Sequence, residues 1–598
     1  MTNKQTILSI ALGAVLATTA YSQSGELSRQ PLGDKHSLIR LDKTKRYLLL
    51  PMQDSAPEAH LRFVSGNKEL SSISARLAQT KVEYTMPVDL TEIGDITALY
   101  ALGVPDSAVV WSQLKQSDSY TIAPDPYRPS YHFAPQLGWM NDPNGMFYLD
   151  GIYHLYYQAN PYGSTWGNLS WGHATSLDLV RWEQQPTALF PDVHGMIFSG
   201  SAVVDKDNTA GFGHNAVVAF YTSARERQTQ SLAYSTDGGR SFTKYEGNPV
   251  LAMPFADFRD PKVIWHTPSK RWVMILAVGQ EMQFYTSTNL KEWSYASSFG
   301  AGYGAHGGVW ECPDLIELPV KGTEERRWVL ICNLNPGGPN GGSAMQYFVG
   351  DFDGKSFTTK TPGSTTKWVD YGKDHYATVS WHNAPGAPIV IGWMSNWEYA
   401  TLTPSKQFRS AMTLPRTLGL YLGEDGEHYL SVQPVSSVET LRGKVRRYGS
   451  SSLSAKGKSY QLPADGRYEL LVEVESGKAK ELSLKLSNEN GEYFDIRLDL
   501  SKGQMACDRS KSGIVNFSDK FPAVAYSPLP KRKSHKLRIF VDNASIEVFD
   551  AEGGRYCQTN IVFPTKPLST LTVSSTGSGA RLGSLAVYPL SIQSNNKN

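Results

Sequence analysis

A loose repeat in the middle of the 598-residue chain limits its possible folds more than any other feature. Four segments share the order strand, turn and aromatic residue, and these aromatic residues lie 60, 51 and 64 residues apart, at Trp182, Phe242, Trp293 and Phe357. Several short strands per unit at this spacing favour the blades of a β-propeller. A fifth unit, with IVIGWMSNW at 389–397, would close the ring. A two-sheet sandwich can show similar strands, so the repeat alone leaves both folds open.

Strand patterns continue on both sides of the repeat. Alternating leucines at 482–486, a turn at Asn490-Gly491 and renewed alternation at 494–498 are typical of a hairpin. We interpret residues 440–595 as a C-terminal β-sandwich and residues 25–125 as an N-terminal β-rich accessory module. With a five-bladed propeller at 126–435, the whole chain is predicted to be all-β.

The beginning of the chain has the pattern of a secretory signal peptide at 1–22. Lys4 precedes a short apolar run at 7–20, and small residues follow it. The pattern predicts a secreted or periplasmic bacterial protein, with an N-terminal membrane anchor as the alternative. No later stretch reaches the roughly 20 apolar residues that span a bilayer, so no membrane span is expected in the mature chain. The net charge of +2 gives no argument for binding nucleic acid.

The four cysteines are too few and too scattered for a disulfide framework or a zinc site. We expect free, buried thiols, with a bond between Cys507 and Cys557 as the alternative. The sequence contains no HExxH pattern or carboxylate cage, so neither a metal nor another cofactor is expected.

Three carboxylates stand in unusual local settings. Asp142 lies in the turn-forming segment GWMNDPNG, Asp260 lies between Arg259 and a proline in FRDP, and Glu311 lies between an aromatic residue and a cysteine in WECPD. Apolar neighbours raise the pKa of a glutamate, whereas an adjacent arginine keeps a carboxylate ionised. We therefore expect a protonated acid at Glu311 and a charged Asp260. Any one of them alone is more often a turn-forming or salt-bridged residue.

Glycoside hydrolysis needs a carboxylic acid and a carboxylate on either side of the bond that breaks. The three candidates fall in successive parts of the repeat, so a propeller could bring them together at its axial funnel. WMNDPNG (139–145), FRDP (258–261) and WECPD (310–314) resemble the three signature blocks of glycoside hydrolase family 32, the invertase, inulinase and levanase family. The resemblance is close over about 131–420 and looser through the C-terminal sandwich. The N-terminal stretch that begins RYLLLP at 46–51 resembles an extra module found ahead of some Bacteroidetes fructanases.

The resemblance implies a five-bladed propeller followed by a β-sandwich, and retaining hydrolysis of β-D-fructofuranosyl linkages in levan or inulin, with sucrose as a further candidate. It makes Asp142 the nucleophile and Glu311 the acid/base, while Asp260 holds the fructosyl hydroxyls. Retaining enzymes hold their two working carboxyls about 5–5.5 Å apart, and we predict that separation for Asp142 and Glu311. The predicted substrate-binding residues are Trp139, Asn141, Gln158, Trp166, Phe198, Ser199, Arg259, Cys312 and Trp397.

Two alternative functions remain at this stage. A fructosyltransferase would use the same covalent intermediate with a sugar as acceptor, and a non-catalytic fructan-binding protein would use the same propeller. The three intact carboxylates speak against the second. An inverting arabinan-type propeller enzyme lacks this combination of blocks. Phe408-Arg409-Ser410 departs from the Trp-Arg-Gly/Ser often found in relatives, which affects a packing position and a distal subsite more than the chemistry.

Overall fold

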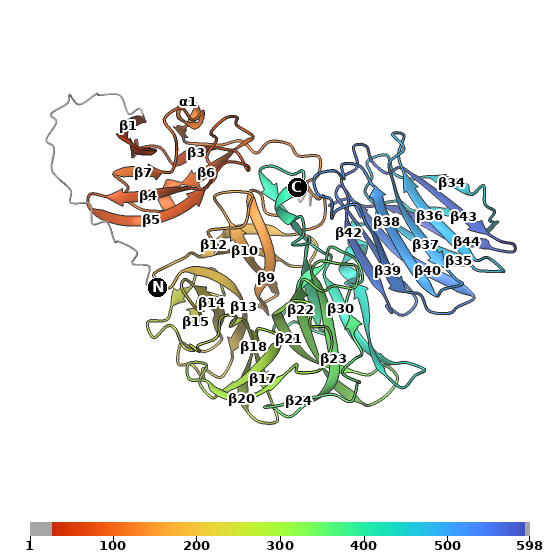
Figure 1. Ribbon diagram of the computed structural model, residues 1–598. Helices are drawn as coiled ribbons and strands as arrows, with labels where there is room; N and C mark the ends of the chain where they lie inside the picture. The colour runs from red at the N-terminus through yellow and green to blue at the C-terminus, as the bar shows by residue number, and fades with distance from the viewer. Residues whose placement is uncertain (1–26, 593–598) are drawn as a thin grey trace, which may run out of the picture. The chain divides into compact units, whose positions relative to one another are not determined.

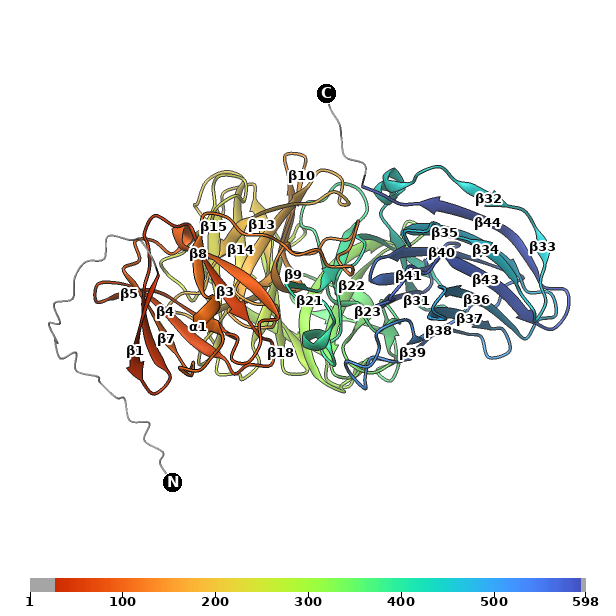
Figure 2. The same cartoon turned by 90° about the horizontal axis from the view of Figure 1, so that it is seen from above.

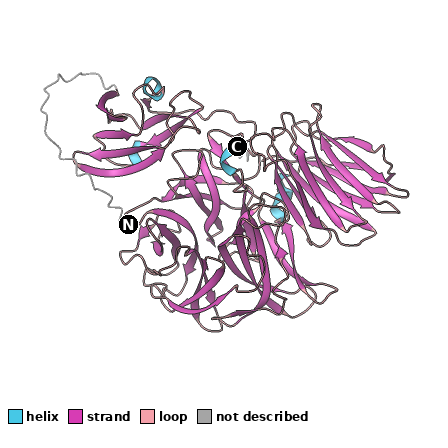
Figure 3. Cartoon of the chain, viewed as in Figure 1, coloured by secondary structure: helices cyan, strands magenta, loops and turns pink. Residues whose placement is uncertain are grey.

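The computed structural model describes residues 27–592, so the predicted signal peptide lies outside the described residues. Strands make up nearly all of the regular structure (Figure 3). The chain divides into two compact units. One holds the described residues up to Pro51 together with Ala56–Lys81 and Pro87–Tyr120, and the other holds Met52–Ser55, Val82–Met86 and the described residues from Thr121 onward. No helix within 27–592 is long and apolar enough to cross a membrane.

The N-terminal region forms two small sheets, with the short helices η1 (Leu90–Glu92) and α1 (Val110–Gln113). Alternate side chains of β4 (Ala59–Ser65), including Leu61 and Phe63, are buried, which is the period-2 pattern of a half-buried strand. The five-stranded sheet has the order β1 (Ser28–Gly33), β2 (His36–Arg40), β7 (Ala98–Leu102), β4 (Ala59–Ser65), β5 (Lys68–Ala75), and the three-stranded sheet has the order β6 (Tyr84–Asp89), β3 (Tyr47–Met52), β8 (Lys115–Ser117).

Five sheets follow and form the ring of a β-propeller (Figure 1). Blade 1 contains β9 (Gly138–Leu149), β10 (Ile152–Asn160), β11 (Ser170–Ser176) and β12 (Glu183–Leu189), and blade 2 contains β13 (Met196–Asp205), β14 (Ala216–Ala224), β15 (Gln228–Ser235) and β16 (Thr243–Lys244). Blade 3 contains β17 (Arg259–His266), β18 (Arg271–Val278), β19 (Glu281–Ser287) and β20 (Ser294–Phe299). Blade 4 contains β21 (Val309–Pro319), β22 (Arg326–Asn335), β23 (Ala344–Phe352), β24 (Phe357–Thr358) and β25 (Lys367–Trp368). Blade 5 contains β26 (Tyr376–Ser380), β27 (Ile389–Met394), β29 (Ala411–Met412), β30 (Arg416–Leu422) and β31 (His428–Pro434).

A late segment of the chain closes the ring onto blade 1. After helix η2 (Ala400–Leu402), strand β28 (Phe408–Arg409) pairs in parallel with β9, so that Phe408 lies opposite Gly138 and Arg409 opposite Trp139. The predicted propeller is thus confirmed, and a sandwich is excluded for the repeat. The segment IVIGWMSNW begins with β27, which is the second strand of blade 5 rather than its first.

The first strand of every blade carries the same irregularity. Where the first strand of a blade pairs with the second, two consecutive residues of the first strand lie opposite a single residue of the second. This arrangement is a β-bulge of one extra residue. A bulge bends its strand and re-aims the side chains within it. The bulged dipeptides are Asn141-Asp142, Phe198-Ser199, Asp260-Pro261, Cys312-Pro313 and Ala377-Thr378, one in each blade, and β9 has a second bulge at Gly145-Met146.

The C-terminal sandwich follows helix η3 (Ser436–Leu441) and packs two antiparallel sheets face to face (Figure 2). The predicted hairpin is confirmed, because Leu484 pairs with Ile496 and Gly491 adopts the positive φ of +76° that its turn requires. One sheet contains β32 (Arg446–Tyr448), β33 (Ser451–Ser452), β44 (Arg581–Pro589), β35 (Tyr468–Glu475), β40 (Ser534–Asp542), β41 (Ser545–Asp550) and β42 (Cys557–Ile561). The other contains β34 (Lys458–Gln461), β43 (Thr570–Thr576), β36 (Glu481–Ser487), β37 (Tyr493–Asp499), β38 (Gln504–Lys511) and β39 (Val524–Pro528).

All four cysteines are buried and free, as expected. Cys507 lies on β38 and Cys557 on β42, which belong to different sheets of the sandwich. Both thiols are free, so the alternative of a bond between them is wrong.

Propeller and sandwich share a buried group of charged side chains, which we call the interface cluster: His132, Asp370, Arg416, Asp542 and Glu547. Arg416 donates to Asp370 at 2.8 Å and to Glu547 at 2.6 Å. The two ring nitrogens of His132 lie 2.8 Å from Asp542 and 2.8 Å from Glu547. Each buried charge thus has an opposite charge at hydrogen-bonding distance, which is what burial of ions requires.

Candidate active site

The bulges of blades 1 and 2 bring Asp142 and Ser199 together. The hydroxyl of Ser199 donates to Oδ2 of Asp142 at 2.6 Å, and the amide of Asn141 donates to Oδ1 at 2.9 Å. Trp139 in turn donates from its indole nitrogen to Asn141 at 2.7 Å. Both carboxylate oxygens of Asp142 are therefore held by neutral donors, and the carboxylate has a fixed orientation.

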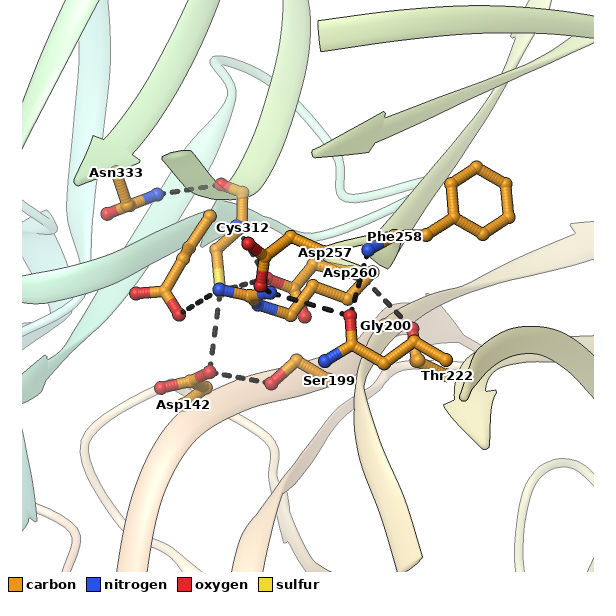
Figure 4. A network of polar contacts seen from close by, with 12 residues as sticks. Asp142, Ser199, Gly200, Thr222, Asp257, Phe258, Asp260, Cys312 and Asn333 are labelled. Atoms are coloured by element: carbon orange, nitrogen blue, oxygen red, sulfur yellow. Dashed lines mark hydrogen bonds and ion pairs between the residues drawn. The ribbon is translucent and has the colours of Figure 1, made fainter. Parts of the chain in front are cut away.

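Cys312 links the bulges of blades 1, 3 and 4 (Figure 4). Its thiol lies 3.4 Å from Oδ2 of Asp142 and 3.6 Å from Oδ2 of Asp260, and its backbone N–H donates to Asp260 at 2.9 Å. Burial raises the pKa of the Cys312 thiol well above its usual range, and the nearby carboxylates Asp142 and Asp260 raise it further. The thiol therefore stays protonated and acts as a donor between the two aspartates.

Glu311 stands on the same strand, next to Arg259 and Tyr376. A guanidinium nitrogen of Arg259 donates to Oε1 at 3.1 Å, and the hydroxyl of Tyr376 donates to Oε2. The side chain of Glu311 is 22% exposed, so part of the carboxyl faces open space. Burial raises its pKa, as does the charge of Asp142, while Arg259 and the Tyr376 hydrogen bond oppose this rise. The expected rise in the pKa of Glu311 is thus confirmed in direction.

The expectation of a firmly ionised Asp260 is wrong. Burial, together with the charges of Glu311 and Asp142, raises the pKa of Asp260 to about 7, although Arg259 pulls it downward. The guanidinium of Arg259 is aimed at Asp257, at 2.5 Å, and at Glu311, while its Nε lies 3.9 Å from Asp260. The ion pair between Arg259 and Asp260 is thus present but long, and its effect on the pKa of Asp260 is smaller than the effect of burial.

The predicted aromatic residues lie around this group. Trp139 stacks on Trp397 with ring centres 5.9 Å apart, and Trp166 meets Phe198 edge to face at 6.1 Å. Trp166 is 42% exposed, which is unusual for tryptophan and leaves part of the ring free. Trp166 adjoins the site through Phe198, which precedes Ser199 in the bulge of blade 2.

Gln158 lies on β10, opposite the bulge that contains Asn141 and Asp142. It is 1% exposed, and neither its amide nitrogen nor its amide oxygen has a hydrogen-bond partner. Buried amides are nearly always hydrogen-bonded in proteins, and a functional role is a common explanation for an exception. The amide of Gln158 is therefore available to hydrogen-bond a polar ligand.

Several residues of the site were missed from the sequence. Tyr376 starts the first strand of blade 5, directly after Lys373, Asp374 and His375, in a segment without a proline. Asn333 donates to the carbonyl of Cys312 at 2.7 Å, and Thr222 accepts from the backbone N–H of Asp260 at 3.0 Å (Figure 4). The rule that could have found Tyr376 is positional, because the first strand of every other blade carries a predicted site residue at its bulge. Within residues 27–592, no group of His, Cys, Asp and Glu side chains is arranged to hold a metal ion.

Comparison with known proteins gives three family matches. Residues 132–434 match the glycosyl hydrolases family 32 N-terminal domain, and residues 437–589 match the family 32 C-terminal domain. Residues 33–131 match a domain of unknown function, DUF4980.

Similar curated proteins include the levanase of Bacillus subtilis (strain 168), which is 45% identical over 478 residues, or 78% of this chain and 70% of the levanase. The extracellular exo-inulinase inuE of Aspergillus niger is 40% identical over 503 residues, or 76% of this chain and 92% of the relative.

Solved structures show the same likeness. An exo-inulinase from Aspergillus awamori superposes with a TM-score of 0.73 at 37% identity, over 79% of this chain and 99% of that chain. The β-fructofuranosidase from Schwanniomyces occidentalis, complexed with fructosyl-erythritol, superposes with a TM-score of 0.73 at 32% identity. This match covers 79% of this chain and 100% of that chain. The five-bladed propeller, the sandwich behind it and these matches together show that the chain is a glycoside hydrolase and belongs to glycosyl hydrolases family 32.

Proposed function

We propose that the chain hydrolyses β-D-fructofuranosyl linkages of fructans with retention of configuration, through a covalent fructosyl-enzyme intermediate. The observation that carries this proposal is the convergence of Asp142, Asp260 and Glu311, from three different blades, on one chain of contacts through Cys312 and Arg259. Two carboxyl groups with different environments are what such hydrolysis requires.

Asp142 acts as the nucleophile. Departure of the leaving group builds positive charge at the anomeric carbon, and a fixed carboxylate both stabilises that charge and then forms the ester bond. The hydrogen bonds from Ser199 and Asn141 keep the carboxylate in one orientation, which supports attack along one line. The retaining mechanism predicts that the carboxyls of Asp142 and Glu311 lie about 5–5.5 Å apart.

Glu311 acts first as the acid and then as the base. Its raised pKa favours the protonated form, which gives its proton to the leaving oxygen. The resulting carboxylate, next to Arg259 and Tyr376, then removes a proton from the water that hydrolyses the ester. Asp260, with a pKa of about 7, both donates and accepts hydrogen bonds to fructosyl hydroxyls and stabilises the transition state.

The remaining predicted residues form the walls of the fructosyl pocket: Trp139, Asn141, Gln158, Trp166, Phe198, Ser199, Arg259, Cys312 and Trp397. The free amide of Gln158 supports this assignment, because its nitrogen and oxygen can pair with vicinal hydroxyls. The exposed ring of Trp166 offers an apolar surface to the sugar.

The names of the relatives support the substrate class and the location. Levanase, exo-inulinase and β-fructofuranosidase all denote enzymes that act on fructosyl linkages, so levan and inulin are the proposed substrates and sucrose a further one. Several of these relatives are named as extracellular enzymes, which supports secretion of this chain. The segment 1–22 is the proposed signal peptide.

The decisive test is product chromatography with levan, inulin and sucrose, each incubated with wild type, Asp142→Ala, Glu311→Ala and the control Glu317→Gln. Glu317 is an exposed carboxylate on the same strand as Glu311. We expect fructose or fructo-oligosaccharides from wild type and Glu317→Gln, and no products from the two alanine variants. Longer oligomers at high sucrose would indicate transfer rather than hydrolysis.

The covalent intermediate is tested separately by mass spectrometry of Glu311→Gln after brief exposure to fructosyl fluoride, because fluoride leaves without a proton from Glu311. A fructosyl adduct on the peptide that contains Asp142 is the expected result. Intact substrates with wild type would overturn the proposed activity, and product formation without any adduct on Asp142 would contradict the covalent route.

A further inference from the structure

The loop between β10 and β11 carries Trp166 and is held at several points. Asn160 donates to the carbonyl of Thr165 at 2.8 Å, and Asn168 donates to Asn160 at 3.0 Å. Ser164, in the middle of the loop, is completely buried. The position of the exposed Trp166 ring therefore depends on the buried segment that precedes it.

Arg409 fixes the backbone of this loop. One guanidinium nitrogen donates to the carbonyl of Ser164 at 2.9 Å, and the other donates to the carbonyls of Thr403 and Ser405 at 3.2 and 3.0 Å. Arg409 is 2% exposed and stands on β28, opposite Trp139 of β9. The same arginine thus connects the Trp166 loop to the strand that carries Asp142.

The counter-charge of Arg409 comes from far upstream in the sequence. Oδ2 of Asp54 lies 2.9 Å from the guanidinium, and Oδ1 accepts a hydrogen bond from the hydroxyl of Tyr84 at 2.7 Å. The hydroxyl of Ser164 lies 3.0 Å from that of Tyr84. Asp54 and Tyr84 belong to Met52–Ser55 and Val82–Met86, the two segments that form one compact unit with the propeller. Both precede residue 132, where the match to the catalytic family begins.

We propose that Asp54 and Tyr84 are positioning residues for the substrate pocket, which act through Ser164 and Arg409 on the loop that carries Trp166. The proposal rests on the proposed function, because it assigns Trp166 to the wall of the fructosyl pocket. A guanidinium buried without its carboxylate must move or admit water, and either change releases the carbonyl of Ser164. The catalytic carboxyls are held by other contacts, so the chemical step itself is left intact.

Loss of the pocket wall and loss of the chemical step have different effects on KM and kcat. A pocket wall contacts the fructosyl ring in the ground state and in the transition state alike, so loss of its position raises KM and leaves kcat unchanged. Misplacement of a binding surface by a fraction of an ångström is expected to raise KM about tenfold. A change that only lowered overall stability would reduce the amount of active enzyme, and would not alter KM.

The test compares Asp54→Asn and Tyr84→Phe with the control Asp89→Asn. Asp89 is also an N-terminal carboxylate with an arginine partner, Arg46 at 2.8 Å, but it lies outside the two segments. Hydrogen–deuterium exchange of peptides that cover 160–170 measures positioning without any substrate. We expect faster exchange there, and a raised KM with unchanged kcat on inulin, for both variants and not for the control.

Coupling to Trp166 provides the sharper criterion. In a Trp166→Leu background, Asp54→Asn should add no further increase in KM, because the wall that it positions is already gone. An equal increase in both backgrounds, or unchanged exchange and unchanged KM in Asp54→Asn and Tyr84→Phe, would overturn the proposal. If wild type cleaved no fructan, the proposed function would fail, while the exchange measurement would still decide whether Asp54 and Tyr84 hold the loop. Tyr84→Phe removes a single oxygen and keeps the test valid if Asp54→Asn folds poorly.

Discussion

Tyr376 gives the proposed acid a hydrogen-bond donor from the fifth blade. Its hydroxyl is buried and donates to Glu311, and the burial raises the pKa of Tyr376 well above its usual range, so the phenol keeps its proton. A donor that cannot ionise stabilises the carboxylate form of Glu311, and this lowers the pKa of Glu311 against the effect of burial. Tyr376 therefore tunes the pH at which the acid works.

Replacement of Tyr376 by phenylalanine should raise the pKa of Glu311. We expect the basic limb of the kcat/KM profile, where the acid loses its proton, to move upward by about one pH unit, because one hydrogen bond to a charged group is lost. Tyr285→Phe, which removes another buried hydroxyl from blade 3, is the control and should leave the profile unchanged. A basic limb at the wild-type pH in Tyr376→Phe would contradict this account.

Asp260 should lower the free energy of unfolding at high pH. Its pKa of about 7 in the folded state lies above the value near 4 in an unfolded chain, so the native protein binds more protons between pH 4 and 7. Stability therefore falls as the pH rises through this window, by as much as roughly 4 kcal/mol. Asp260→Asn should lack this decline and be the more stable protein at pH 8, although inactive. Denaturant unfolding at pH 5 and pH 8 measures both; an equal decline in the variant would refute the assignment.

The sequence identified single residues well where chemistry leaves a local mark. Asp142, Asp260 and Glu311 were found because prolines, an arginine and a cysteine stand next to them, and the structure brings these residues together. Tyr376 carries no such mark, since the group that it contacts, Glu311, lies on another blade. The pKa of Asp260 was missed for the same reason: the groups that decide it lie on other blades.

At the scale of the strand, one repeated device builds the site. Each first strand contains a bulge of one extra residue, and Asp260, Cys312 and Ala377 adopt positive φ values of 64°, 41° and 54° within three of them. Non-glycine residues rarely adopt this conformation, and they do so mainly where a surrounding structure enforces it. The spacing of aromatic residues predicted the blades, but a register shift of one residue has no clear signature in a single sequence.

Gly200 tests how tightly one bulge is packed. A Cβ at this position would stand 1.9 Å from the carbonyl oxygen of Phe220, a backbone atom of the neighbouring strand that cannot turn away. Gly200→Ala should therefore destabilise the protein by roughly 3 kcal/mol and displace Ser199 from Asp142. Gly449→Ala, where a Cβ meets nothing within 4 Å, is the control and should change stability by less than about 0.5 kcal/mol. Thermal unfolding and kcat/KM are the measurements, and full activity in Gly200→Ala would show that the strands can separate freely.

At the scale of the whole molecule, buried charges connect the sandwich to the propeller. Apolar residues of both lie in one continuous core that includes Leu418, Val432, Phe540 and Phe549. The interface cluster lies beside this core, with Arg416 and Asp370 completely buried. Breaking such a pair leaves an uncompensated buried charge, so we expect propeller and sandwich to unfold together.

His132 should make this joint sensitive to alkaline pH. Hydrogen bonds and ion pairs with Asp542 and Glu547 outweigh the effect of burial and raise the pKa of His132 to about 9. A histidine whose pKa is raised in the folded state stabilises the protein fully below its unfolded pKa of about 6.5. This stabilisation is lost as the pH rises through about 9. Wild type should lose roughly 3 kcal/mol across this range beyond any loss in His132→Gln. Denaturant unfolding at pH 6 and pH 9.5 measures the difference, and parallel curves for the two proteins would rule the mechanism out.

The interface cluster also bears on how such a chain can be recombined. The positive charges of His132 and Arg416 come from the propeller, whereas two of the acids that neutralise them, Asp542 and Glu547, come from the sandwich. A chimera that joins this propeller to a foreign sandwich inherits two buried cations without these anions. The catalytic half is therefore not an interchangeable part, and a successful graft must bring acids at both positions.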